Sequence, residues 1–246
     1  MTTRPLLGIL GGMGPEAAVY FYQLILKKTA AKCDQDHIPT LNYQATFLPD
    51  RVEMINAGKN DEFLVELRCA LATLYKANIS CLAVPCNTVH YFLNQLRDEI
   101  TLPFFHLIDG CIEHLVNQNI KSATLLSTIG TIQTRLYHEG AEKKGITLHV
   151  PDSDDQFQVS NAIKKIKGGQ PAEDFATKLQ LILERLAQTN GPNFILGCTE
   201  LPLIFQQKNR PDNHDHLRLI DPMEAIAEQV CEHFKQAELT RKEIKA

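Results

Sequence analysis

The sequence predicts an α/β protein made of two similar α/β/α domains with parallel sheets, related by pseudo-symmetry, with the active site in the cleft between them. Two observations predict this fold. Short apolar or β-branched runs alternate with amphipathic helical patterns along the chain, which is typical of βα units and parallel sheets. Segments of the first half also recur in the second half at a nearly constant spacing. The 246 residues are 44% hydrophobic and 22% charged, which suffices for a sizeable core.

Eight short runs are expected to form the strands of these sheets. Most are apolar and have the length expected for strands buried between helices. In chain order they are Leu6–Gly11, Leu41–Phe47, Cys81–Pro85, Phe104–Leu107, Thr124–Ser127, Thr147–Val150, Asn193–Gly197 and Leu217–Ile220.

Two of the segments between these runs show a clear helical period. Leucines or other large apolar residues recur at spacings of three and four, so each segment presents one apolar face to a sheet. The two faces consist of Leu64, Leu67, Leu71 and Leu74, and of Phe175, Leu179, Ile182 and Leu186. Acidic pairs, Asp61-Glu62 and Glu173-Asp174, are expected to begin these helices, and Asn78 stands where a left-handed cap would end the first.

An internal repeat divides the chain into two halves. Leu10–Gly14 resembles Leu126–Gly130 with an offset of 116 residues, and Val84–Thr88 resembles Leu196–Glu200 with an offset of 112 residues. Because the offsets nearly agree, we expect one domain over residues 106–215. The other comprises residues 1–105 together with 216–246, whose strand and helix are expected to return to the first half.

Composition and charge favour a small-molecule partner. The net charge is −4 and the basic residues are dispersed, which disfavours nucleic acid and anionic membranes as partners. No segment reads as a signal peptide or membrane span. Seven cysteines, an odd number without short paired spacing, indicate reduced thiols and a cytoplasmic protein.

Two of the cysteines differ from the rest. Cys86 and Cys198 each follow an apolar strand and precede a polar helix start, where unsatisfied N–H groups are expected to lower a thiol pKa and make a thiolate base available. Two matched groups facing one cleft could remove a proton from one face of a stereocentre and deliver one to the other. The remaining cysteines are interpreted as buried small hydrophobic residues: Cys33, Cys69, Cys81, Cys111 and Cys231.

Five segments in register resemble the aspartate/glutamate racemase family. They are Gly11–Ala17, Pro49–Arg51, Pro85–Thr88, Leu125–Thr131 and Gly197–Pro202. The resemblance implies a cofactor-independent racemase without pyridoxal phosphate, metal or nucleotide, usually a homodimer, which uses two cysteines on an acidic amino acid. The opening Gly-Gly-Met-Gly-Pro segment, in place of the Asp-Ser-Gly start of glutamate racemases, points to the aspartate branch.

The resemblance also assigns substrate-binding residues. Arg51 matches the family's carboxylate-binding loop, and Lys167, before Gly168-Gly169, matches a position that is often basic. A solvated turn for the arginine and a favourable position at a helix C-terminus for the lysine are the alternative explanations. The glycines are expected to let the backbone approach the substrate, with Met13 as a wall. Other expected contacts are Gly12, Asn87, Thr88, Thr128, Thr131, Thr199 and Glu200, although capping alone would explain Asn87 and Thr199.

Several different functions remain open at this point. Gly12-x-Gly14-x-x-Ala17 fits a dinucleotide fingerprint, which would make the protein an NAD-dependent oxidoreductase, but no acidic residue closes a strand about 20 positions on. Cys86 with His90 could form a cysteine hydrolase. A zinc site at His214 and His216 lacks the usual spacing. A related isomerase of broader substrates and a non-catalytic ligand-binding protein also fit the sequence.

Overall fold

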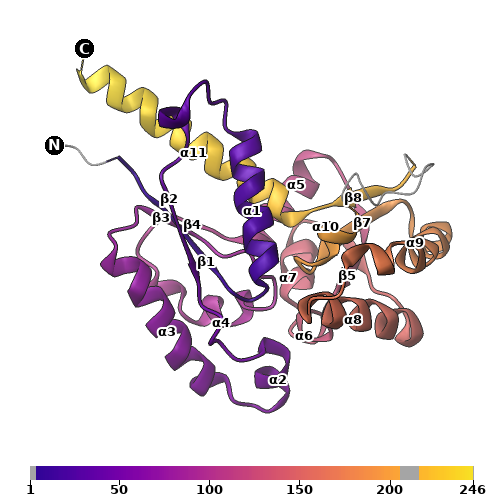
Figure 1. Cartoon of the computed structure of the whole chain (residues 1–246). Coiled ribbons are helices and arrows are strands. Elements are labelled where there is room, and N and C mark those ends of the chain that lie inside the picture. The colour runs from indigo at the N-terminus through magenta and orange to yellow at the C-terminus, as the bar shows by residue number, and fades with distance from the viewer. Residues whose placement is uncertain (1–3, 206–215, 246) are drawn as a thin grey trace.

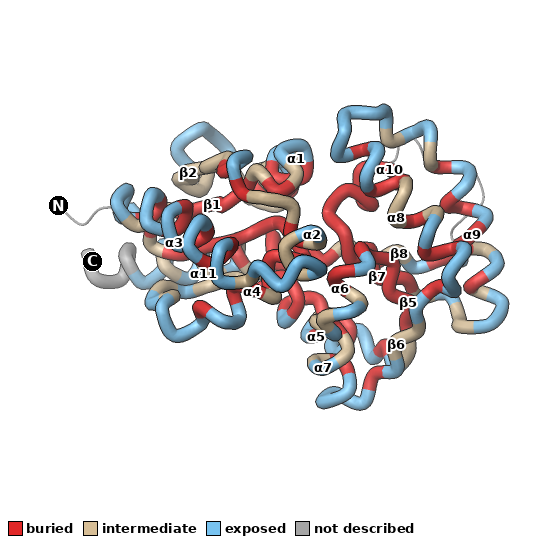
Figure 2. Tube along the Cα trace, turned by 90° about the horizontal axis from the view of Figure 1, so that it is seen from below, coloured by how far each residue is buried: buried red, intermediate tan, exposed pale blue. Residues whose placement is uncertain are grey.

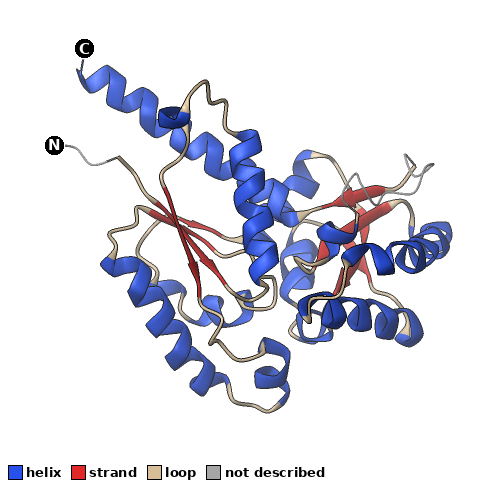
Figure 3. Ribbon diagram, in the orientation of Figure 1, coloured by secondary structure: helices blue, strands red, loops and turns tan. Residues whose placement is uncertain are grey.

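The computed structural model describes residues 4–205 and 216–245 and contains two four-stranded parallel sheets (Figures 1 and 3). The first has the order β2-β1-β3-β4 and the second β6-β5-β7-β8, so the two sheets share one topology. This confirms the predicted pair of similar α/β units. The strands are β1 (Leu7–Gly11), β2 (Thr40–Gln44), β3 (Cys81–Ala83), β4 (Phe104–Phe105), β5 (Ser122–Ser127), β6 (Thr147–His149), β7 (Asn193–Gly197) and β8 (Arg218–Ile220).

Helices cover both faces of each sheet. The described α-helices are α1 (Pro15–Lys28), α2 (Arg51–Asn56), α3 (Asn60–Lys76), α4 (His90–Gln95), α5 (Leu107–Asn117), α6 (Ile129–Gln133), α7 (Leu136–Lys143), α8 (Ser153–Lys167), α9 (Ala176–Asn190), α10 (Leu201–Ile204) and α11 (Pro222–Lys245). Alternate strand residues face opposite layers. Leu125 packs with α5 and α7, whereas the next residue, Leu126, packs with α8 and α9. None of the helices in the described ranges is both long and apolar enough to cross a membrane.

The expected helix signals hold in part. The leucine face of α3 is buried, Asp61 and Glu62 lie in its first turn, and Asn78 has a left-handed φ of 56°. Glu173 and Asp174, in contrast, lie in a short 3-10 turn (Ala172–Phe175) that precedes α9. The acidic pair therefore marks the approach to that helix and not its first turn.

The last strand lies in the second sheet. β8 pairs in parallel with β7, with Phe194 opposite Leu219 and Ile195 opposite Ile220, so the expectation that residues 216–220 return to the first half is wrong. Pairing there satisfies the open edge of β7 and buries Ile220 in the second core. α11 packs along α1, as expected, and along α5, so it joins the two halves.

This topology sets where a ligand can bind. In both sheets the chain changes direction between the two central strands, β1 and β3 or β5 and β7, and ligands of open α/β sheets bind at the carboxyl ends of such strands. The two sets of ends face each other, because Thr88 beyond β3 contacts Thr128 beyond β5 and Gly14 beyond β1 contacts Glu200 beyond β7. Figure 2 shows buried segments of both halves meeting at the centre of the molecule.

The turn after β1 requires glycine for a reason that differs from the one expected. Gly12 has a φ of +91°, and a Cβ there would lie 2.6 Å from the backbone nitrogen of Ala45 and 2.8 Å from that of Thr46. The close approach that an added Cβ would block is thus that of the segment after β2. Gly12 brings the ends of β1 and β2 together and thereby shapes this side of the site.

Replacing Gly12 with alanine should lower the free energy of unfolding by about 3 kcal/mol, since it adds left-handed strain to an overpacked backbone contact. Gly145→Ala is the matched control, because Gly145 has a φ of +66° with no atom within 4 Å of an added Cβ. It should cost about 1 kcal/mol. Urea unfolding of both variants measures the difference, and equal costs would contradict the role given to the Ala45 contact.

Candidate active site

Cys86 and Cys198 both lie at the facing carboxyl ends of the sheets. Each is nearly buried, with 4% and 5% of its surface exposed. Turns follow both, and the helices begin only at His90 and Leu201. The caps of these helices make no side-chain hydrogen bond, so the interpretation of Asn87 and Thr199 as capping residues is wrong. Asn87 and Thr199 therefore lie in the turns between each cysteine and the helix that follows it.

Cys198 has a carboxylate partner. Its thiol donates a hydrogen bond to Oε2 of Glu200 at 2.9 Å. Burial raises the pKa of the Cys198 thiol well above its ordinary value, and the charge of Glu200 raises it further, while Lys167 opposes the shift. The expected lowering of this pKa is therefore wrong. Cys198 is held in the protonated form, which is the form a proton donor needs.

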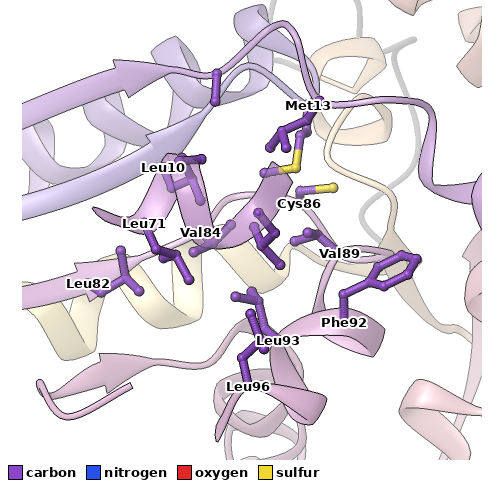
Figure 4. Close-up of a cluster of buried hydrophobic side chains, with 14 of the residues drawn as sticks. Leu10, Met13, Leu71, Leu82, Val84, Cys86, Val89, Phe92, Leu93 and Leu96 are labelled. Atoms are coloured by element: carbon purple, nitrogen blue, oxygen red, sulfur yellow. The ribbon is translucent and has the colours of Figure 1, made fainter. Parts of the chain in front are cut away.

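Cys86 lies in apolar surroundings. Its side chain belongs to the core cluster of the first half, and Figure 4 shows Met13 beside Cys86 in this cluster. Met13 is 2% exposed and belongs to the same apolar cluster as Cys86. Cys198 has Glu200 as its neighbour and Cys86 has this apolar cluster, so the two cysteines have equivalent positions in the fold but different surroundings.

His90 supports the Cys86 turn and is not placed as its base. Its Nδ1 hydrogen-bonds to the carbonyl oxygen of Cys86 at 2.7 Å, and its Nε2 accepts the N–H of Leu107 at 3.1 Å. Nδ1 must then carry the proton, so both ring nitrogens are occupied. Burial, followed by neighbouring His106, lowers the pKa of His90 well below its usual value. A cysteine hydrolase based on this pair would lack its base.

Glu200 also closes the glycine-rich turn. A Cβ on Gly14 would lie 2.2 Å from Oε1 of Glu200, so the carboxylate stands directly against the N-terminus of α1. In a dinucleotide site the pyrophosphate occupies this end of the helix. The position of Glu200 would place two anions together there, which argues against an NAD-dependent oxidoreductase.

Arg51 and Lys167 supply the positive charge of the site. Arg51 is 6% exposed and donates through its two terminal nitrogens to the carbonyl oxygens of Pro49 and Met13, while its Nε has no partner. Lys167 ends α8 and is reached by solvent. Desolvation opposes its charge, but Glu200, Cys198 and Cys86 raise the pKa of Lys167, so it stays protonated beside both thiols.

Hydroxyl and amide groups complete the junction. The Oγ1 atoms of Thr88, Thr128 and Thr131 form a buried ring with separations of 3.0 to 3.1 Å. Asn87 is 2% exposed and accepts a hydrogen bond from the Tyr137 hydroxyl at 2.5 Å, while its Nδ2 has no partner. Thr199 is turned toward Glu200, to which its hydroxyl donates at 3.4 Å. The site thus holds donors from both halves.

Comparisons of sequence and of structure relate this chain to the same group of proteins. Residues 10–230 match the family model described as Asp/Glu/Hydantoin racemase, which is most of the chain. The chain belongs to this family. Its members are racemases, which are isomerases, so the chain is an isomerase of this kind.

Named relatives include both branches of the racemases. The broad specificity amino-acid racemase RacX of Bacillus subtilis is 25% identical over 206 residues, covering 81% of this chain and 87% of the relative. The aspartate racemase of Picrophilus torridus superposes with a TM-score of 0.74 at 24% identity, covering 94% of each chain. Glutamate racemase of Francisella tularensis, solved with D-glutamate, gives a TM-score of 0.62 at 17% identity, covering 97% of this chain and 84% of that one. These structures share the fold.

The remaining cysteines of this racemase follow the sequence-based interpretation only in part. All seven cysteines are free; Cys81 and Cys111 are buried as expected, but Cys33 and Cys69 are exposed.

Tyr137, inside α7, has no sequence motif around it, and only its hydrogen bond to Asn87 identifies it as part of the site. His214 lies outside the described residues, and His216 hydrogen-bonds to Glu184. The residues at 4–205 and 216–245 contain no group of three or more potential metal ligands.

Behind the Cys86 turn, His106 gives the racemase a pH-sensitive support. Its Nδ1 accepts the N–H of Asp109 and caps α5, its Nε2 pairs with Oδ1 of Asn94 at 3.0 Å, and its ring meets His90 edge-on at 4.4 Å. Burial, aided by Arg97, lowers the pKa of His106 to about 3. Its ordinary value is about 6.5. Between these values the unfolded chain binds a proton that the folded chain does not.

The His106→Asn variant keeps a capping acceptor but cannot titrate. Relative to this variant, the wild-type free energy of unfolding should fall by about 2 kcal/mol from pH 7.5 to pH 5.0, because protonation stabilises only the unfolded histidine. Urea unfolding of both proteins at the two pH values gives the difference. A pH-independent difference would show that the pKa of His106 is the same in the folded and unfolded protein, which contradicts the lowered value.

Proposed function

We propose that this protein catalyses the reversible, cofactor-independent racemisation of an acidic amino acid, aspartate first and glutamate second. The observation that carries the proposal is the pair of pseudo-equivalent cysteines at the two facing switch points, with cationic Lys167 between their halves. No pyridoxal phosphate, metal or nucleotide takes part in the reaction we propose. We also propose a cytoplasmic homodimer with domains near residues 1–105 and 106–215; the free cysteines fit a reducing compartment.

The chemistry is a proton exchange across one carbon. One cysteine, as thiolate, takes the α-proton, so the C–H bond breaks as an S–H bond forms. The other, as thiol, delivers its proton to the opposite face, so the new C–H bond has inverted geometry. In the direction that uses the hydrogen-bonded Cys198 thiol as the proton donor, Cys86 acts as the base. For the reverse direction, Lys167 offsets the repulsion between a Cys198 thiolate and Glu200.

Substrate carboxylates match the two donor groups of the site. The unpartnered Nδ2 of Asn87 and the hydroxyls of Thr88, Thr128 and Thr131 lie beside the cysteine turns and bind the α-carboxylate, on which charge builds when the proton leaves. Arg51 and Lys167 bind the distal carboxylate. Glu200 is better placed to hold Cys198 than to contact the substrate.

A broader amino-acid racemase is the second candidate. Its support is the relative RacX, which is described as having broad specificity. Racemisation of a panel of amino acids separates the candidates, because an acidic-substrate enzyme requires the distal carboxylate and a broad one does not.

Replacing Cys86 or Cys198 with serine should lower racemisation of aspartate by at least about a thousandfold, because serine is a far weaker acid and base. Each variant retains one thiol, so any remaining α-deuterium uptake from D₂O should be confined to one enantiomer, and the two variants should differ in which. Polarimetry and mass spectrometry measure the two effects.

Cys69→Ser is the matched control, because Cys69 is exposed on α3 away from the facing strand ends. It should racemise as the wild type does. If the wild type exchanges no α-hydrogen of L- or D-aspartate or glutamate, the proposed function is wrong. If both serine variants racemise normally, the two thiols are structural.

Replacing Lys167 with methionine should lower kcat/KM for aspartate by about 10- to 100-fold, since a charge-assisted hydrogen bond to the distal carboxylate is lost. Lys164→Met, one turn earlier on the same helix and exposed, should leave kcat/KM unchanged. Steady-state kinetics measures both. An equal effect of Lys167→Met on the turnover of alanine, if alanine is a substrate, would place Lys167 outside distal-carboxylate binding.

A further inference from the structure

The amide of Asn87 is held from across the junction between the halves. Asn87 is 2% exposed and belongs to the turn after Cys86 in the first half, whereas Tyr137 belongs to α7 in the second. The Tyr137 hydroxyl donates to Oδ1 of Asn87 at 2.5 Å, a distance typical of an O–H···O bond. Nδ2 of the same amide is buried and has no partner. A buried amide thus has its acceptor satisfied by protein and its donor left open.

An unpartnered buried donor costs free energy unless a ligand satisfies it. The charges around it indicate which ligand. Lys167 and Arg51 bring positive charge to the site, and Asn87 adjoins Thr88, whose hydroxyl also faces the second half. A carboxylate oxygen is therefore the natural acceptor for Nδ2. The donor is useful only if the amide keeps this orientation.

Tyr137 is suited to fix that orientation. Its ring is fully buried in the cluster formed by α5, α7 and β5, so the position of its hydroxyl is set by packing. Burial, followed by Cys111 and Asp221, raises the pKa of Tyr137 well above its ordinary value, so the hydroxyl keeps the proton that it donates. The oxygen and nitrogen ends of an amide have nearly the same shape, and only hydrogen-bond partners distinguish them.

We propose that Tyr137 is a positioning residue that locks the Asn87 amide with its NH₂ group toward the α-carboxylate of the substrate. This role rests on the proposed racemase function. Without the Tyr137 hydroxyl the amide can turn over and present its oxygen to a carboxylate oxygen, which is repulsive. Because the contact crosses between the halves, it also makes the binding-competent state of the first half depend on correct docking of the second.

Tyr137→Phe should raise KM for the racemised acidic amino acid about 10-fold and change kcat by less than about 3-fold, because carboxylate binding weakens while both thiols stay in place. Tyr20→Phe is the matched control. The Tyr20 hydroxyl also donates over a long sequence distance, to Asp221 at 3.1 Å, and neither residue is among the proposed substrate-binding groups. It should leave KM unchanged. Kinetics of both variants is measured well below their unfolding temperatures.

The Asn87→Ala variant separates a role of Tyr137 in orienting the amide from a general effect of the Tyr137 substitution on stability. In Asn87→Ala the amide is absent, so adding Tyr137→Phe should change KM by less than about 2-fold. Asn87→Asp keeps the acceptor for Tyr137 but turns an oxygen toward the substrate, so its KM should exceed that of Asn87→Ala. These comparisons concern pairs in direct contact, for which non-additivity reports coupling.

Three outcomes would overturn the role of Tyr137. They are an unchanged KM in Tyr137→Phe, an equal rise of KM in the Asn87→Ala background, and a lower KM for Asn87→Asp than for Asn87→Ala, which would mean that the amide oxygen faces the substrate ammonium. A wild-type protein that racemises no acidic amino acid would instead refute the proposed function. Wild-type activity is therefore measured first, and the two failures stay distinct.

Discussion

Polar groups at the junction of the two sheets must find their partners across it, and this constraint organises the site. Thr88 is satisfied by Thr128 and Thr131, and the amide oxygen of Asn87 by Tyr137. Each of these contacts joins a turn of one sheet to an element of the other. Buried polar groups without partners are costly, so the halves cannot slide without breaking these bonds. The shared strand order then brings both cysteine turns to the same interface. The geometry of the racemase site follows from this docking.

The same junction concentrates charge. Glu200 reaches from the second half to the N-terminus of α1 in the first, where only a glycine leaves room for it. Its carboxylate accepts a hydrogen bond from the Cys198 thiol and raises the pKa of Lys167. The Glu200 anion therefore stabilises both the protonated thiol and the protonated lysine. Arg51 donates to the carbonyl oxygen of Met13, whose side chain packs in the same cluster as Cys86, and to that of Pro49. The charged side chains of this junction therefore hold the backbone at Met13 and the thiol of Cys198 in place.

The sequence was informative where local pattern decides structure. The eight strands, the leucine face of α3 and the equivalence of the Cys86 and Cys198 turns all follow from periodicity and repetition. Contacts between distant segments were not predictable. No sequence motif near Tyr137 indicates its hydrogen bond to Asn87. The pairing of β8 depends on the open edge of β7, which lies in a distant part of the sequence. Gly12 is required because the segment after β2 passes close to its backbone. The predicted lowering of the Cys198 pKa was also wrong, because the thiol is buried and the carboxylate of Glu200 lies beside it, while the helix begins only three residues later.

Equivalent positions with unequal neighbours have a consequence for catalysis. A two-base racemase needs each thiol to serve as acid and as base, so the free energies of the two protonation patterns must lie close together when substrate is bound. The surroundings of the two thiols differ, because the Cys198 thiol donates a hydrogen bond to Glu200 while Cys86 lies in an apolar cluster. Under the proposed function, an acidic amino acid would add an ammonium and two carboxylates to the charges of Lys167, Arg51 and Glu200. The proposed mechanism then requires the bound substrate itself to bring the two protonation patterns close together in free energy.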